Sequence, residues 1–159
     1  MGSAYVVPQT WQDETYPDNT AFNREVRDNL NHVKYPPYAA SALATARTTT
    51  ATTFAAINTA LNLVFTTYGG YIKVGLVGNG GVVGGPYACY DIALNGTRIS
   101  PSVSGATIVG DSSGNAFFTR TLTGRPSGVY TAQAQYRADV GTTTARAISG
   151  LLLWAYEVP

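Results

Sequence analysis

Residues of the types that do chemistry are sparse in this chain, and their spacing matches no catalytic or metal-binding motif. His32 is the only histidine and Cys89 the only cysteine, so the sequence offers neither a histidine-rich metal site nor a disulfide within the chain. The acidic residues beyond the N-terminal segment are scattered, at Asp91, Asp111, Asp139 and Glu157. A glycosidase would need a pair of carboxylates. We therefore expect no enzyme activity, no metal and no cofactor.

Structural roles account for the histidine and the cysteine. His32 falls late on a predicted helix, where it can interact with the negative end of the helix dipole. Cys89 lies within Tyr87–Ile92, which is predicted to be a strand. Free cysteines are usually buried as small apolar side chains, and we expect that here.

Three further patterns have functional and structural interpretations. The run Gly78–Gly84 looks like a dinucleotide-binding loop, but it misses the G-x-G-x-x-G spacing and precedes a strand, so we predict a turn. Asn95-Gly96-Thr97 matches a glycosylation acceptor, but a hairpin turn explains it without a secretory route. The 11 tyrosines could stack on sugars, although interface and core positions are their more frequent use.

Composition indicates a subunit of an assembly, because a nearly neutral surface with few charges favours association. Charged residues make up 12%, against about 25% in typical domains, and the formal net charge is +1. Ten Lys and Arg against nine Asp and Glu give no basic excess for nucleic acid. No apolar run reaches the roughly 18 residues of a membrane span. The start of the chain lacks the pattern of a signal peptide, so we expect assembly in a reducing cytoplasm.

The N-terminal residues 1–34 are predicted to be a docking arm. Residues 1–17 contain Trp11 and show no helical period, which favours an extended segment, whereas a helix is expected over about 19–34. Its apolar stripe consists of Phe22, Val26, Leu30 and Val33. A helix of this length is marginal alone, so the stripe needs a partner surface. We expect Trp11, Phe22, Val26 and Leu30 to bind that partner.

Strand signals dominate after the arm. Residues 35–52 are rich in small side chains and are predicted to be a linker that enters the head through an edge strand. The head itself is predicted over 53–159. Strands are expected at 61–67, 71–77, 87–94, 97–99, 115–122, 129–138 and 144–158, with a loop over 100–114. About eight strands with glycine-rich turns predict an antiparallel β-sandwich or jelly roll.

The predicted last strand, 144–158, suggests an oligomer. Leu151-Leu152-Leu153-Trp154 places apolar side chains on both faces, whereas a strand with one wet face would alternate. We therefore expect one face to be covered by the core and the other by a second subunit. Leu151, Leu153 and Trp154 are the predicted interface residues of a closed homo-oligomer.

The arm also carries a family pattern. Thr10-Trp11, Glu14, Thr20-Ala21, Asn23 and Val26-Arg27-Asp28-Asn29-Leu30 resemble the opening of a group of small virion proteins of tailed bacteriophages. Asp91–Arg98 and Trp154–Val158 resemble their head. Asp13 departs from the pattern, because a glycine commonly precedes the glutamate there. The resemblance implies a homotrimeric β-sandwich or jelly-roll module on the outside of a phage particle.

Three functions are compatible with these observations. The first is a capsid decoration, or cement, protein whose trimers sit on the virion surface and bind the major capsid protein through their arms. The second is a tail-fibre, baseplate or head-fibre component that contacts other tail proteins or a glycan of the host surface. The third is a carbohydrate-binding module or enzyme. The short chain with one head and an arm favours the first.

Overall fold

The computed structural model describes residues 26, 27, 29, 30, 38–110 and 114–158. Residues 26, 27, 29 and 30 are helical, and the remaining regular structure consists of antiparallel strands. The strands are β1 (Tyr38–Ala42), β2 (Arg47–Thr49), β3 (Ala55–Ala56), β4 (Asn62–Thr67), β5 (Gly70–Val77), β6 (Asn79–Val83), β7 (Tyr87–Leu94), β8 (Thr97–Arg98), β9 (Thr107–Gly110), β10 (Gly114–Asn115), β11 (Phe118–Arg125), β12 (Gly128–Ala138), β13 (Thr144–Ala147) and β14 (Leu152–Val158). The prediction of a mainly β, antiparallel fold is confirmed.

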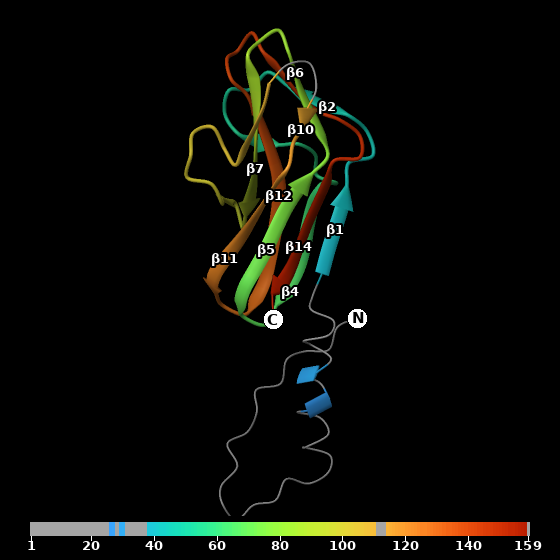
Figure 1. Ribbon diagram of the computed structural model, residues 1–159, viewed down its shortest axis with the longest axis vertical. Coiled ribbons are helices and arrows are strands. Elements are labelled where there is room, and N and C mark those ends of the chain that lie inside the picture. The colour runs from blue at the N-terminus through green and yellow to red at the C-terminus, as the bar shows by residue number, and fades with distance from the viewer. Residues whose placement is uncertain (1–25, 28, 31–37, 111–113, 159) are drawn as a thin grey trace, which may run out of the picture.

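The strands form two layers, which Figure 1 shows one in front of the other. The front layer contains sheet A, with the order β1-β14-β5-β11, and sheet B, with the order β10-β6-β13-β2. The back layer is sheet C, in which β3-β12-β7-β8 is extended by β4 beside β12 and by β9 beside β7. Sheet B continues sheet A beyond its upper end in the figure, so together they cover one face of sheet C.

Each long strand of the front layer is broken where sheet A gives way to sheet B. Gly78 separates β5 from β6 with a φ of 145°, and an added Cβ there would lie 2.7 Å from Leu151 Cα. Hydrogen bonds continue across the break, from Ala116 N–H to Gly78 O (2.9 Å) and from Ile148 N–H to Asn79 O (3.0 Å). The layer is therefore bent and remains hydrogen-bonded.

This break corrects two predictions. The single last strand expected over 144–158 is wrong, because β13 belongs to sheet B and β14 to sheet A, with Gly150 (φ 87°) between them. The turn expected over Gly78–Gly84 is also wrong for most of its length, because β6 occupies Asn79–Val83. Both errors arise because pairing with distant strands decided the local conformation.

The hydrophobic core lies between the layers. Along β12 the predicted alternation is present, with Tyr130, Ala132, Ala134 and Tyr136 buried against the front layer. Sheet A contributes its own buried positions, Ile72, Val74, Leu76 and Leu153. Each such large aliphatic side chain contributes about 1.5–3 kcal/mol when it is fully buried.

Tyr90 ties the two layers together through a buried hydroxyl. It donates a hydrogen bond to Arg146 O (2.5 Å) and accepts one from Gly81 N–H (3.0 Å). A Cβ at Gly80 would lie 2.4 Å from the same oxygen, so β6 needs glycine there. Burial raises the pKa of Tyr90 to about 12. The hydroxyl thus stays protonated at neutral pH. Its hydrogen bonds join β7 of the back layer to Gly81 and Arg146 of the front layer.

The segments around the expected linker and loop contain strands. Residues 38–42 and 47–49, within the predicted linker, form β1 and β2 at the edge of the front layer, and Leu43 between them is buried. The predicted loop over 100–114 includes β9, which pairs with β7. The predicted hairpin is present at Asn95 (φ 49°) and Gly96 (φ 79°), which join β7 to β8.

Candidate assembly surface

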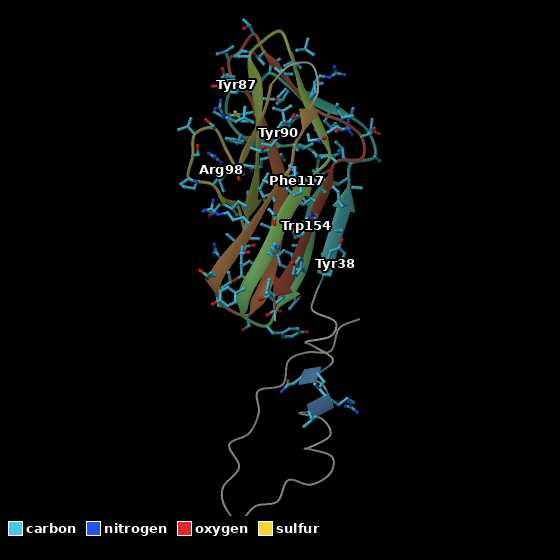
Figure 2. All side chains as sticks on the ribbon, viewed as in Figure 1. Tyr38, Tyr87, Tyr90, Arg98, Phe117 and Trp154 are labelled. Carbon is cyan, nitrogen blue, oxygen red and sulfur yellow. The ribbon has the colours of Figure 1, made fainter. Side chains whose placement is uncertain are left out.

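The outer face of sheet A carries a row of aromatic side chains. Along β14 burial alternates, so Leu153, Ala155 and Glu157 point into the core while Trp154 and Tyr156 point outward. Strand pairing extends this outer face sideways, because Tyr156 lies opposite Tyr38 of β1 and Val158 lies opposite Tyr71 of β5. We call Tyr38, Tyr71, Trp154 and Tyr156 the aromatic face; Figure 2 labels Tyr38 and Trp154 on it.

Trp154 lies flat on the sheet over a glycine. It pairs with Gly75 of β5, and a Cβ added at Gly75 would lie 2.2 Å from Trp154 Cζ2. The indole also stacks on Tyr156, with ring centroids 5.6 Å apart and an angle of 19° between the planes. The absence of a side chain at Gly75 therefore lets the indole cover the backbone and present a flat ring surface.

The rim of the aromatic face is open. Tyr38 is 64% exposed and Tyr71 is 50% exposed. Among the residues that strand pairing places on this face, only Lys73 is charged, and it lies opposite Tyr156. Large exposed aromatic side chains with little charge around them are typical of the buried centre of protein interfaces.

The structure separates the three predicted interface residues. Leu151 and Leu153 are fully buried in the core of this chain, so the prediction that they line a subunit interface is wrong. Trp154 is partly exposed on the aromatic face and keeps its predicted role as a candidate. Tyr38, Tyr71 and Tyr156 were missed, although the alternation Leu152-Trp154-Tyr156 was a signal for the outward side of β14.

The predicted arm residues are only partly within the described chain. Trp11 and Phe22 lie outside the described residues, as does His32. Val26 and Leu30 are helical and are 43% and 63% exposed, so the side chains of this part of the stripe are accessible to a partner. The chain enters the head at Tyr38, on the rim of the aromatic face.

The outer side of sheet C is organised differently, around buried charges. Asp91 accepts a hydrogen bond from Arg98 Nε at 2.8 Å. Burial raises the pKa of Asp91, and the hydrogen bond from Arg98 opposes that rise. The Arg98 guanidinium lies 3.9 Å from the centre of the Phe54 ring, and Arg137 lies 5.5 Å from it. These contacts fasten the segments around Phe54 and Val103 over the sheet, because Arg137 Nε–H also donates to Val103 O (3.2 Å).

Two further ionisable side chains, Cys89 and Glu157, are buried in the fold. Cys89 is buried, and burial raises the pKa of its thiol, which disfavours the reactive thiolate. Glu157 is buried and accepts hydrogen bonds from Tyr68 N–H at 3.0 and 3.2 Å. Within the described residues, no three His, Cys, Asp or Glu side chains gather into a metal site. None of the helical residues described belongs to a segment long and apolar enough to cross a membrane.

The sequence matches no protein-family model and no curated protein.

Proposed function

We propose that this protein is a structural component of a tailed-bacteriophage virion, a homotrimer that decorates the outside of the capsid shell and stabilises it. The observation that carries the proposal is the aromatic face, a flat and nearly uncharged surface at the point where the N-terminal arm joins the head. The phage context and the trimer rest on the resemblance of the arm. In this proposal the aromatic face packs against a second copy and the arm binds the major capsid protein.

The strand order of the head supports the jelly-roll prediction. If each broken front strand is counted as one, the front layer contains β1–β2, β13–β14, β5–β6 and β10–β11 side by side, and the back layer contains β3–β4, β12, β7 and β8–β9. Most connections therefore cross from one layer to the other, and the first and last strands are neighbours. This order supports an arrangement of two interleaved Greek keys, and such jelly rolls are frequent in viral capsid proteins.

Oligomeric state tests the aromatic face. We expect native mass spectrometry and light scattering of the full chain at micromolar concentration to give a trimer. The double variant Tyr38→Arg/Tyr71→Arg should be monomeric, because it places two charges at the rim of an apolar contact. The matched control, Val64→Arg/Val129→Arg, alters exposed residues of sheet C and should remain trimeric. A wild-type monomer, or a trimeric Tyr38→Arg/Tyr71→Arg variant, would contradict the proposal.

Particle binding tests the arm. Deletion of residues 1–34 should leave the head folded and abolish incorporation into particles, since buried aromatic anchors often contribute 2 kcal/mol or more each. Trp11→Ala and Phe22→Ala should each reduce occupancy, whereas Arg27→Ala, which lies outside the predicted apolar stripe, should change it little. Occupancy at the wild-type level after the deletion would show that the arm is not the anchor.

Capsid stability tests the cement role. A protein that binds only the assembled shell stabilises it by about 2.7 kcal/mol per site at a hundredfold excess over Kd. Particles without this protein should therefore release DNA at lower temperature than complete particles. Equal release would remove the cement role.

A tail-fibre, baseplate or head-fibre role is the second proposal. It is favoured by the flat Trp154–Tyr156 stack, which could equally receive a sugar ring of a host glycan. Copy number in a cryo-EM map separates the two roles, with hundreds expected for cement and a few to dozens for a fibre. Loss of adsorption to host cells by depleted particles would support the fibre.

A further inference from the structure

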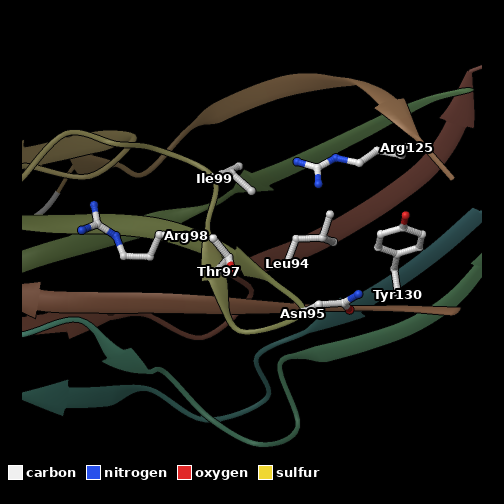
Figure 3. A pocket seen from close by; sticks show the side chains of 7 residues that line it. All are labelled: Leu94, Asn95, Thr97, Arg98, Ile99, Arg125 and Tyr130. Atoms are coloured by element: carbon white, nitrogen blue, oxygen red, sulfur yellow. The ribbon is translucent and has the colours of Figure 1, made fainter.

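A cavity of about 250 Å³ opens at the side of the sandwich, away from the aromatic face. It lies where β11, an edge of sheet A, faces the β7–β8 hairpin of sheet C. Figure 3 shows Leu94 and Ile99 between Arg125 and the Asn95–Thr97 turn, with Tyr130 at one end. The cavity is thus lined by apolar groups from the core and by polar groups from the two edges.

Arg125 lines this cavity, and none of the described residues forms an ion pair with it. Its Nε is buried and forms no hydrogen bond, and no acidic residue within the described part of the chain pairs with it. A register shift between Leu122 and Arg125, with Gly124 at a φ of 62°, interrupts the regular alternation of β11 just before it. A buried N–H group that lacks an acceptor is costly, and the guanidinium that carries it has no counter-charge among the described residues, so the position favours an anion beside it.

The second arginine at the cavity is already neutralised. Arg98 lines the wall, but its Nε–H donates to Asp91 (2.8 Å) and its guanidinium lies over Phe54. Figure 3 shows its charged end turned away from Arg125. The Arg125 guanidinium is therefore the one positive charge at the cavity that no described residue compensates. Its charge favours an anion, and its planar fork of N–H groups suits a carboxylate.

Neutral hydrogen-bonding groups surround that charge. Asn95 Oδ1 accepts a hydrogen bond from Thr131 N–H (2.8 Å). This bond uses the oxygen of the side-chain amide, so the amide NH2 group can donate to a ligand. The Tyr130 hydroxyl donates to Pro126 O (3.0 Å) and keeps acceptor capacity. Thr97 adds a hydroxyl. Such a set suits the hydroxyl groups of a sugar, while Leu94 and Ile99 suit its C–H face.

We propose that this cavity binds a sugar acid, a single ring that carries a carboxylate, with the carboxylate on Arg125 and the ring hydroxyls near Asn95 and Thr97. The site is distinct from the aromatic face, so the inference goes beyond the proposed assembly function. Its failure would leave the trimer and the particle binding untouched.

Titration of the full-length protein with glucuronate, glucose and inorganic phosphate tests the proposal. Calorimetry or amide chemical shifts should show glucuronate binding at least tenfold more tightly than glucose or phosphate. Arg125→Gln should weaken glucuronate binding tenfold or more, because it removes a charge-assisted hydrogen bond. Arg120→Gln, an exposed position on the same strand and outside the cavity lining, should leave binding unchanged.

Each other outcome overturns the proposal. Equal binding of phosphate and glucuronate would show a site for any small anion. Equal loss in Arg125→Gln and Arg120→Gln would place binding elsewhere. Absence of binding by all three probes would show that Arg125 only covers the open side of the core, and a lower melting temperature of Arg125→Gln would then report that covering role.

Discussion

The two outer faces of the sandwich differ in whether segments of this chain lie over them. On sheet C the chain covers one part of the face itself, because the segments around Phe54 and Val103 lie over the sheet and are held by Arg98 and Arg137, whereas Val64 and Val129 stay exposed. On sheet A nothing within the described residues covers Trp154 and its neighbouring tyrosines. A domain that covers the buried charges of one face with its own segments and leaves aromatic rings open on the other is organised for contact with another molecule at the aromatic rings.

Removing one partner of the Asp91–Arg98 ion pair on sheet C should have the largest effect on stability. Asp91→Ala leaves Arg98 without its buried partner, and breaking such a pair usually costs about 3–5 kcal/mol. Since the Arg98 side chain is 29% exposed, we expect the lower end, about 3 kcal/mol in urea unfolding. The double variant Asp91→Ala/Arg98→Met removes both charges and should recover part of the loss. No recovery would show that packing, and not the pair, holds this face.

The buried hydroxyl that joins the layers should come next. Tyr90→Phe leaves Gly81 N–H and Arg146 O without their partner and should cost about 1–3 kcal/mol. The pKa of Tyr90 is about 12 in the folded chain and about 10 when unfolded. A raised pKa gives stability that is complete below pH 10 and is lost as the pH rises from 10 to 12.

Alkaline unfolding checks this sign. Between pH 10 and 12 the wild type should lose roughly 2 kcal/mol more than Tyr90→Phe, since phenylalanine has no proton to release. Tyr130→Phe is a suitable control, because its hydroxyl bonds only to Pro126 O at the end of the sandwich. Identical alkaline profiles for wild type and Tyr90→Phe would contradict the assignment.

Lifting the indole from the open face should affect assembly more than stability. Gly75→Ala places a methyl group where Trp154 lies and should cost about 1–2 kcal/mol, because the indole can move outward. The displaced ring would roughen the aromatic face, so the trimer should weaken in native mass spectrometry. Gly110→Ala is the matched control, since its nearest neighbour is 3.5 Å away. A full-strength trimer in Gly75→Ala would remove the flat indole from the interface.

Exposed apolar residues on sheet C should show the smallest effect. Val64→Ser and Val129→Ser change side chains that are 69% and 63% exposed and should shift stability by no more than about 0.5 kcal/mol. Neither should change the mass of the assembly. Dissociation of the trimer by either substitution would move the interface from sheet A to sheet C.

Local patterns predicted the parts of the fold that local chemistry determines. The alternation of 129–138 and the Asn95-Gly96 turn correspond to β12 and to the β7–β8 hairpin. Long-range contacts decided the rest. The glycine run from Gly78 became a strand because it pairs with β13, and Tyr90 occupies the space beside Gly80; no local signal shows either contact.

The candidate sites follow the same division. The apolar run Leu151–Trp154 indicated an interface near β14, but it was assigned to the wrong side chains, because Leu151 and Leu153 fill the core. The Arg125 cavity joins β11 to a hairpin far away in sequence, so only the folded chain brings its lining together.

The pairing of β1 with β14 has a mechanical consequence. The head begins with β1, whose residues from Tyr38 to Ala42 pair with Tyr156 to Leu152, and the ladder continues through Leu43 and Leu151. Antiparallel hydrogen bonds lie perpendicular to the strands, so tension on the arm along the axis of β1 loads all of them at once in shear. A tether that leaves the head at Tyr38 would therefore resist force as a set of parallel bonds, and would not open one bond at a time.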